Sequence, residues 1–446
     1  MQTPRQHGVT AIRILAYTCA IPLPPDSMLT RLPYTLLWLL ALPFVLLRLV
    51  WRGRRQPGYL KHLGERFGRY AVRAPAQVIW VHAVSVGETR AAEPLIKALL
   101  ERWPEHSIVL THMTPTGRET SKDLFKGDHR ILRCYLPYDI GCFVHAFLRH
   151  FRPQFGVIME TELWPNLLAA CRRRKVPVML ANARLSERSA RRYARLPALS
   201  AMTIGGLSAI GAQTAADAAR LSALGARRVV VTGNIKFDIT PPDDTSARAR
   251  FLRAQTGDRP LLLGASTRDG EEALLLDAFA RLAPPEVLLV LVPRHPQRFD
   301  EVAKLASARG LRLQRRSANA AVDADTRIWL GDSMGEMFVY YALADVALIG
   351  GSWLPFGGQN LIEACASGTP VVIGPHTFNF AAVAEHAISA GAARRASDVE
   401  TGICIGLELL DDAATRGAMA TAGKAFAEAD RGASARTLEM LENLKP

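Results

Sequence analysis

Apolar and polar positions alternate along the chain in a pattern that predicts two successive runs of parallel βαβ units. Short apolar runs that end in glycine or polar residues are typical of buried strands, and the longer amphipathic stretches between them are typical of helices. In the first run we expect helices over Thr89–Arg102, Leu163–Lys175 and Ala215–Leu224. The expected strands of this run are QVIWVHAV, SIVLTHM, GVIMETEL, PVMLANAR, SAIGAQT and RRVVVTGN.

The segment FDITPPDDTSARAR interrupts the pattern with two prolines and three acidic residues, which predicts a linker. The second run begins after it, with the expected strands PLLLGAS, EVLLVLVPRH, RIWLGD, VALIGGS and PVVIGPH. We therefore expect a Rossmann-like domain over residues 56–240, a linker over 241–258 and a second such domain over 259–446. Ligands of such sheets bind beyond the carboxyl ends of the strands, so we expect an α/β protein whose two domains face a cleft.

One apolar run does not fit the βαβ pattern: sixteen uncharged residues extend from Leu32 to Leu47. The arginines beside it are Arg31, Arg48, Arg52, Arg54 and Arg55. An apolar segment with cationic flanks is typical of a membrane-anchor helix, which we place at residues 28–55; a buried core helix is the alternative. The run is shorter than the roughly 20 residues that span a bilayer, so a spanning and an interfacial anchor both remain open. Because most of the arginines follow the run, the positive-inside rule puts the rest of the chain in the cytoplasm.

Residues 1–27 show no periodic pattern of apolar positions. We interpret them as an N-terminal extension that can be disordered. Since Met28 begins the apolar segment directly, we hypothesise that it is the physiological start of the protein. Finding Met1 or Gln2 at the N-terminus of the native protein would contradict this hypothesis.

The formal net charge of +14 favours an anionic partner, which can be a nucleic acid, an anionic lipid or a phosphorylated substrate. Arginine spread over solvated faces explains the charge equally well. The six cysteines are scattered, without a CxxC pair or a cysteine–histidine cluster of zinc spacing. We therefore expect free thiols and no metal site.

Carboxylates and a lysine follow three of the expected strands in the first domain. Glu88 follows WVHAV in the loop SVGE, where Gly87 permits a tight turn, and a carboxylate there can accept a proton from a substrate hydroxyl. Glu160 and Glu162 follow GVIM, and Lys236 follows RRVVVTGN, where an ammonium group can stabilise a leaving phosphate. Each of these residues also has a structural alternative. Glu88 can complement a helix dipole, and either Glu160 or Glu162 can cap a helix. Lys236 can be a solvated side chain.

The second domain carries the stronger candidate for a phosphate-binding site. Arg294 follows EVLLVLVP and has the planar donor fork that suits a phosphate. The residues DSMGE end another strand and open a helix, which Asp332 or Ser333 can simply cap. In GGSWLPFGGQNLIE, four glycines precede a helix, so backbone N–H groups can approach a phosphate and Glu363 can hold ribose hydroxyls. The alternative is that this loop is a purely structural turn. Because the loop matches neither the dinucleotide-binding fingerprint nor the P-loop, the sequence disfavours hydride transfer and kinase chemistry.

Together, these motifs resemble those of bacterial Kdo transferases, which move 3-deoxy-D-manno-octulosonic acid (Kdo) from CMP-Kdo to a lipid A precursor. The resemblance extends in the same order from about Met28 to the C-terminus. Its motifs are RGRRQPGY, GERFG, HAVSVGET, MTPTGRE, LPYD, METELWPN, ANARLS, TGNIKFD, PRHPQRF, GDSMGEM, GGSWLPFGGQNLIEA and GPHTFNF. Two residues depart from it: Gln359 stands where many relatives have His, and Ser333 where many have Thr, and both keep the ability to form hydrogen bonds.

The resemblance implies an inverting GT-B glycosyltransferase that needs no metal or cofactor and transfers Kdo from CMP-Kdo to lipid IVA in lipopolysaccharide core biosynthesis. By position, it implies that Glu88 deprotonates the acceptor hydroxyl while Glu160 and Lys236 support the transition state. The residues implied to bind CMP are Pro293, Arg294, Met334, Gly335, Glu336, Asn360, Leu361, Ile362 and Glu363. The first domain would bind the acceptor and the second would bind CMP-Kdo. The implied location is the cytoplasmic face of the bacterial inner membrane, with anionic lipids and no nucleic acid as partners.

Two other functions remain open. Another GT-B enzyme, with a UDP- or GDP-sugar donor and a lipid acceptor, would share the glycine loop and Glu363 but would not explain the GE loop and ETELWPN together. Turnover of a UDP-hexose and none of CMP-Kdo would favour it. A basic membrane scaffold or nucleic-acid binder would explain only the net charge, since the sequence has no basic-aromatic stripe and no recognised nucleic-acid motif.

Overall fold

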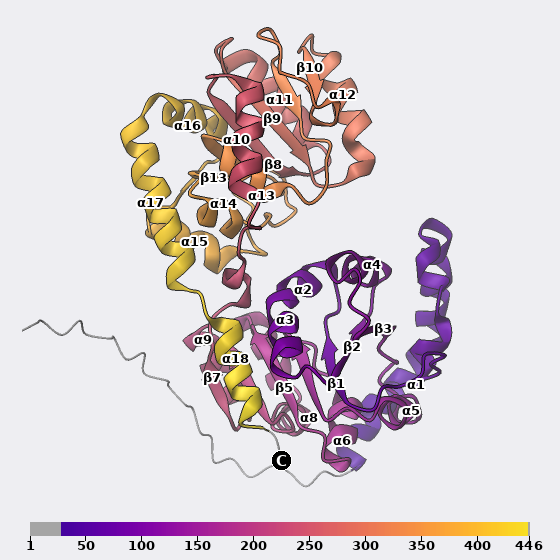
Figure 1. Cartoon of the computed structure of the whole chain (residues 1–446). Helices are drawn as coiled ribbons and strands as arrows, with labels where there is room; N and C mark the ends of the chain where they lie inside the picture. Colours follow the sequence, from indigo (N-terminus) through magenta and orange to yellow (C-terminus); the bar gives the residue numbers. More distant parts are fainter. Residues whose placement is uncertain (1–27, 445–446) are drawn as a thin grey trace, which may run out of the picture. The chain divides into compact units, whose positions relative to one another are not determined.

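The computed structural model describes residues 28–444, which form two compact units (Figure 1). The first unit contains the chain up to Asp238 and again from Arg431, and the second contains Ile239–Asp430. The extension expected over residues 1–27 lies outside the described residues.

The first unit is built on seven parallel strands in the order β3-β2-β1-β4-β5-β6-β7. These strands are β1 Val78–His82, β2 Ser107–His112, β3 Ile131–Tyr135, β4 Phe155–Met159, β5 Val178–Ala183, β6 Ala209–Ala212 and β7 Val229–Val231. The helices of its Rossmann-like part are α2 Val86–Ala91, α3 Glu93–Arg102, α4 Pro115–Leu124, α5 Gly141–Phe151, α6 Pro165–Arg173, α7 Glu187–Ala194, α8 Pro197–Ile204 and α9 Ala215–Ala223. All six expected strands are present, and β3 is an additional strand that the apolar pattern does not predict. The single helix expected over Thr89–Arg102 is divided into α2 and α3 because Pro94 has no N–H to continue the helix through its first turn.

The core of the first unit lies on both faces of this sheet, because alternate residues of a strand point to opposite faces. On β1, Trp80 packs with the aromatic side chains of Phe147 and Phe151 on one face. Its neighbour Ile79 packs with Leu95 of α3 on the other face. All these side chains are almost completely buried, and burying each contributes roughly 1.5–3 kcal/mol. The packing therefore fixes the carboxyl end of β1, from which the candidate base extends.

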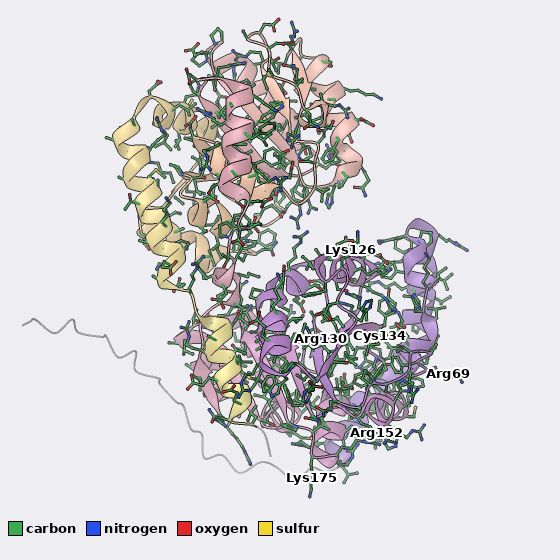
Figure 2. The ribbon with its side chains drawn as sticks, viewed as in Figure 1. Arg69, Lys126, Arg130, Cys134, Arg152 and Lys175 are labelled. Carbon is green, nitrogen blue, oxygen red and sulfur yellow. The ribbon has the colours of Figure 1, made fainter. Side chains whose placement is uncertain are left out.

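Many basic side chains of this unit lie at its surface, whereas Arg31, Arg66 and Arg118 are buried. Figure 2 shows Cys134 of β3 inside the unit, whereas Arg69, Arg152 and Lys175 lie at its periphery. Solvated basic residues thus account for part of the net charge of +14.

The last helix, α18 Ala433–Glu442, belongs to the first unit, whereas the sequence expectation assigned residues 259–446 to the second domain. Asp238 accepts a hydrogen bond of 2.6 Å from the Gly432 N–H and a second one from the Ser434 N–H. The apolar face of α18 joins the core beside α3, which the apolar pattern of a single helix cannot reveal.

The second unit has a parallel sheet of the same size in the order β10-β11-β9-β8-β12-β13-β14. Its strands are β8 Leu261–Thr267, β9 Leu288–Pro293, β10 Leu313–Arg315, β11 Ile328–Leu330, β12 Val346–Ile349, β13 Val371–Ile373 and β14 Ala393–Arg395. Its helices are α10 Thr245–Thr256, α11 Glu271–Leu282, α12 Phe299–Ser307, α13 Met337–Leu343, α14 Ile362–Ser367, α15 Ala381–Ser389, α16 Val399–Asp411 and α17 Ala413–Ala429. The five expected strands are present, together with the short β10 and β14 at the two edges.

Most of the expected linker over residues 241–258 is helix α10 of the second unit. The helix packs on α13, and it buries Leu252. Arg253 forms an ion pair of 3.3 Å with Asp345, which lies just before β12. The prolines and acidic residues that interrupt the βαβ pattern lie before the first turn of the helix, where they do not oppose it.

Gly350, which follows β12, lies so close to β8 that a Cβ atom would come within 2.5 Å of the Ser266 carbonyl oxygen and 2.6 Å of the Thr267 Cα. We expect Gly350→Ala to lower the free energy of unfolding of the second unit by about 1–3 kcal/mol, because the backbone must shift. The matched control is Gly417→Ala in α17, where a Cβ would meet no atom within 4 Å and the helix should gain about 0.5–1 kcal/mol. Urea unfolding measures both changes, and a neutral Gly350→Ala would contradict the close packing.

Helix α1, Met28–Arg55, is the one helix within residues 28–444 that is long and apolar enough to cross a membrane. Its apolar side chains are largely exposed, Leu40 to 72% and Phe44 to 73%, so it is not the buried core helix of the alternative interpretation. Its first turns contact the rest of the first unit, where Arg31 Nη1 donates to Asn166 Oδ1 over 3.0 Å. An exposed apolar helix needs an apolar environment, which favours membrane association.

Candidate active site

Glu88 lies in the first turn of α2, which begins at Val86 rather than near Thr89 as the sequence suggests. Its Oε2 accepts a hydrogen bond of 2.8 Å from the Val84 N–H, and its Oε1 accepts one of 3.4 Å from the Ser85 hydroxyl. The carboxylate therefore also caps the start of the helix, much as in a capping box. These bonds fix its position at the carboxyl end of β1.

The surroundings of Glu88 make it a stronger base than a solvated carboxylate. Burial raises its pKa to about 8, the N–H of Val84 opposes this rise, and the negative charges of Glu160 and Glu162 add to it. The pKa of Glu162 is itself raised by burial and by the charge of Glu160. A base with a pKa close to neutral pH is well matched to removing a proton from a hydroxyl.

Glu160 and Lys236, predicted independently from two strand ends, form an ion pair of 3.3 Å. Glu160 follows β4 directly and has a φ of +60°, while its N–H donates to the Ala181 carbonyl oxygen over 2.9 Å. A non-glycine residue with this backbone conformation stores roughly 1–3 kcal/mol of strain, and such residues cluster at functional sites. The structure therefore brings Glu88, Glu160, Glu162 and Lys236 together in one site of the first unit.

Asn182, at the carboxyl end of β5, is a buried residue of this site that the sequence motifs did not single out. It has a φ of +54°, and its Oδ1 accepts a hydrogen bond of 3.0 Å from the Ile235 N–H. The next N–H, that of Lys236, donates to Asn234 Oδ1 over 3.1 Å. Asn182 thus positions the backbone beside Lys236. The only sequence signal for it was a polar residue after an apolar strand, within the motif ANARLS.

The segment that carries Glu160 and Glu162 is held at its far end by the buried carboxylate of Asp139. This carboxylate accepts hydrogen bonds of 2.9 and 2.8 Å from the N–H groups of Asn166 and Leu167, at the start of α6. Burial raises the pKa of Asp139 to about 6, although these hydrogen bonds oppose the rise. Asp139 therefore positions the segment rather than the reacting groups.

In the second unit, the residues proposed for the nucleotide lie at the carboxyl ends of β9 and β11. Pro293 ends β9, and the Arg294 N–H donates to the Thr267 carbonyl oxygen over 2.9 Å. Met334 is exposed to 58%, and Gly335 has a φ of +79°, so this turn offers backbone to a ligand. Glu336, by contrast, is buried and already paired.

The partners of Glu336 are two arginines and a serine. Arg248 of α10 forms an ion pair with it, and Arg316 forms another of 3.3 Å. The hydroxyl of Ser333 also donates to the carboxylate. A nucleotide at this turn would therefore meet the two guanidinium groups together with Glu336.

The glycine loop leads into the short helix α14. Leu361 and Ile362 are buried, so only their backbone can contact a ligand. The Ile362 N–H donates to Asn360 Oδ1 over 3.1 Å, and Asn360 Nδ2 donates to Glu363 Oε1 over 3.0 Å. This arrangement orients the Glu363 carboxylate, whose role in holding ribose hydroxyls stays a prediction.

Glu271, in the first turn of α11, was not predicted, although it holds the glycine loop. Its buried carboxylate accepts hydrogen bonds of 2.7, 2.9 and 3.3 Å from the N–H groups of Gly351, Trp353 and Leu354, and one of 2.8 Å from Arg268. An acidic residue in a first helical turn is ordinary in a sequence, so only the loop's position in space reveals this role.

Each unit thus carries polar groups beyond the carboxyl ends of a parallel sheet, and two such units in one chain are the architecture of the GT-B fold. The structure is similar to a glycosyltransferase from Rickettsia africae, with a TM-score of 0.55 over 84% of this chain and 99% of the other. The identity between them is 13%, so this similarity concerns the fold alone.

Sequence comparison identifies the protein family to which the chain belongs. The family described as 3-deoxy-D-manno-octulosonic-acid transferase (kdotransferase) matches residues 61–239. The chain is 46% identical to the 3-deoxy-D-manno-octulosonic acid transferase of Bordetella pertussis, over 88% of this chain and 95% of the relative. It is 37% identical to the transferase of the same name from Haemophilus influenzae, over 92% of this chain and 98% of the relative. The chain therefore belongs to the Kdo transferase family, and the resemblance found in its motifs is confirmed.

Proposed function

We propose that this enzyme transfers Kdo from CMP-Kdo to the lipid A precursor lipid IVA, with inversion and without a metal, in lipopolysaccharide core biosynthesis. The observation that carries the mechanism is a buried carboxylate of raised pKa, Glu88, in one site with the Glu160–Lys236 ion pair. Such a set supplies both a base and a fixed cation, which a glycosyl transfer without a metal requires.

In the proposed reaction, Glu88 accepts the proton of the acceptor hydroxyl as the hydroxyl oxygen bonds to the ketosidic carbon of Kdo. The bond from that carbon to the phosphate oxygen breaks on the opposite side, and its electron pair leaves with CMP. One displacement of this kind inverts the configuration. Negative charge grows on the phosphate, where Lys236 and Arg294 stabilise it as cations.

We assign CMP-Kdo to the second unit and the acceptor to the first. Arg294, the turn at Met334–Glu336 and the backbone of Asn360–Glu363 would hold CMP, because each offers N–H or guanidinium donors at the carboxyl ends of the strands. The exposed apolar face of α1 and the basic surface of the first unit suit a lipid acceptor at the cytoplasmic face of the inner membrane. Anionic lipids are the partners that this surface favours.

The proposal is tested by mass analysis of the product formed from CMP-Kdo and defined lipid IVA. We expect a mass increase of one or more Kdo units and release of CMP. Product formed from a UDP-hexose, with none from CMP-Kdo, would show that another GT-B reaction is correct. The anomeric configuration of the product, compared with that of the donor, tests the inversion.

Lys236→Met is expected to lower kcat by about 10²–10³-fold, because a fixed cation is lost where negative charge develops. The KM for the acceptor should change much less. A matched control is Lys97→Met, which removes another lysine paired with a glutamate, Glu93, at 2.8 Å on the surface of α3. Steady-state kinetics of both variants compares them, and an unchanged kcat for Lys236→Met would remove the residue from the mechanism.

A further inference from the structure

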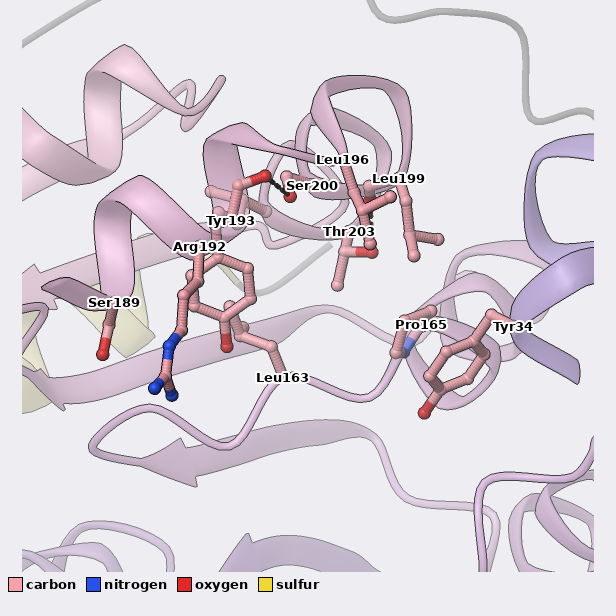
Figure 3. A pocket seen from close by; sticks show the side chains of 11 residues that line it. Tyr34, Leu163, Pro165, Ser189, Arg192, Tyr193, Leu196, Leu199, Ser200 and Thr203 are labelled. Atoms are coloured by element: carbon pink, nitrogen blue, oxygen red, sulfur yellow. Dashed lines mark hydrogen bonds between the residues drawn. The ribbon is translucent and has the colours of Figure 1, made fainter. Parts of the chain in front are cut away.

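A pocket of about 380 Å³ opens in the first unit between α8, the segment after Glu162 and the apolar helix α1. Figure 3 shows Leu199 and Thr203 of α8 on one side of it, Leu163 and Pro165 on another, and Tyr34 of α1 at its end. Most of these side chains are apolar. The pocket is thus of the size and character of a site for a small apolar ligand.

The helix at one edge of the pocket, α7, is rich in arginine. Helix α7 contributes Arg192 and Ser189 to the lining, and none of its residues is buried. Arg188 and Arg195 are exposed on the same segment, whose only acidic residue, Glu187, is paired with another arginine at 2.5 Å. An apolar interior beside exposed guanidinium groups fits a molecule with an apolar chain and an anionic head.

The walls of the pocket connect the candidate active site to the apolar helix. Leu163 follows Glu162 directly, and Pro165 begins α6, whose first N–H groups are fixed by Asp139. Tyr34 lies on α1 and accepts a hydrogen bond of 2.8 Å from Trp38 Nε1. A chain that reached the pocket from a membrane around α1 would therefore bring its head group towards Glu160 and Glu162.

We propose that this pocket binds one acyl chain of the acceptor glycolipid, while Arg192 and its neighbours on α7 face an acceptor phosphate. The proposal rests on the proposed function, since it specifies how the lipid acceptor is held. The volume suits a single acyl chain. With that chain in the pocket, the hydroxyl-bearing sugar of the acceptor would lie outside the pocket, near the carboxylates of Glu160 and Glu162. Because burying a methylene group is favourable, each one that enters the pocket strengthens binding about fourfold.

The proposal is tested with synthetic phosphorylated disaccharide acceptors that differ only in acyl-chain length, including one without acyl chains. For the wild type, we expect kcat/KM to rise about fourfold per methylene until the pocket is full. Leu199→Trp, which fills the pocket, and Leu196→Asp, which puts a charge at its exposed mouth, should flatten this dependence and raise the KM of acylated acceptors at least tenfold. Both should leave kcat/KM of the chain-free acceptor unchanged.

The matched control is Phe251→Asp, which introduces the same charge at an apolar residue of similar exposure, 63% against 60% for Leu196, in the second unit. It should keep the full dependence on chain length. Leu196 is exposed, so its substitution tests the pocket even if Leu199→Trp does not fold. An undiminished dependence on chain length in Leu196→Asp would overturn the proposal.

Photocrosslinking separates this proposal from the proposed function. An acceptor with a diazirine at the end of its acyl chain should label peptides containing Leu163 or Leu199, whether or not transfer occurs. Labelling there without any Kdo transfer would refute the proposed function alone, and labelling elsewhere would refute the pocket. Competition by phosphatidylglycerol vesicles as effective as that by unlabelled acceptor would assign the pocket to bulk lipid and overturn the proposal.

Discussion

Glu88→Gln is expected to reduce the rate of Kdo transfer by about 10²–10⁴-fold, the usual contribution of a general base. Glutamine keeps an amide oxygen that can accept the hydrogen bond from the Val84 N–H, so the start of α2 should remain capped. The variant removes basicity while leaving the local structure in place. Its melting temperature and its affinity for CMP should therefore match those of the wild type.

The pH dependence gives a second, independent signature of the same residue. Because the pKa of Glu88 is raised to about 8, the carboxyl group is mostly protonated at neutral pH and cannot accept a proton. For the wild type, kcat/KM should rise tenfold per pH unit below this value and level off above it. In Glu88→Gln this rise should be absent.

Glu119→Gln is a suitable control for both measurements, because Glu119 is an exposed residue of α4 that forms an ion pair with Lys122 on the same helix. It should change neither the rate nor the pH profile. Near-normal transfer by a folded Glu88→Gln enzyme would limit Glu88 to its capping role.

Glu271→Ala is expected to lower the free energy of unfolding of the second unit by about 3 kcal/mol or more. The substitution leaves four backbone N–H groups without their acceptor, and those of Gly351 and Trp353 donate through buried hydrogen bonds. An unsatisfied buried donor costs about 1–3 kcal/mol, whereas water can replace the more exposed bonds. The glycine loop should then lose its conformation, and binding of CMP should fall with it.

Urea unfolding and calorimetric titration with CMP measure these two effects. Glu408→Ala, which removes an exposed carboxylate from α16, is the control and should be close to neutral. If Glu271→Ala kept the stability of the second unit but lost CMP, the carboxylate would contact the nucleotide instead of the loop. If it kept both, the hydrogen bonds to the loop would carry little energy.

The sequence predicted the central strands of both sheets and the edge strand β7, whose VVV run is apolar, and it missed three strands: β3, β10 and β14. All three lie at sheet edges, and each contains arginine, as in ILRCY, LQR and ARR. An edge strand has a neighbour on one side only and can direct charged side chains to solvent, so it lacks the continuous apolar run that identifies a central strand. The pattern therefore reveals burial on both faces more readily than it reveals strand pairing.

For the site, the sequence could predict residues that follow a strand directly, because topology alone places them at one edge of the sheet. Glu88, Glu160 and Lys236 are of this kind, and the structure brings them together. Asn182 and Glu271 act by accepting hydrogen bonds from segments tens of residues away. Such partners are set by tertiary packing, which no local spacing encodes. The binding and catalytic roles of the predicted residues stay predictions until the variants are measured.

The return of α18 to the first unit has a consequence for the order in which the protein can mature. A ribosome synthesises residues 239–430, which include the whole second unit, before it reaches the helix that completes the core of the first. The N-terminal half, although made earlier, emerges with the surface beside α3 uncovered and with Asp238 lacking the Gly432 and Ser434 N–H groups that it accepts from. Folding during synthesis can therefore finish the second unit first, while the core of the first unit is completed only after α18 has been translated.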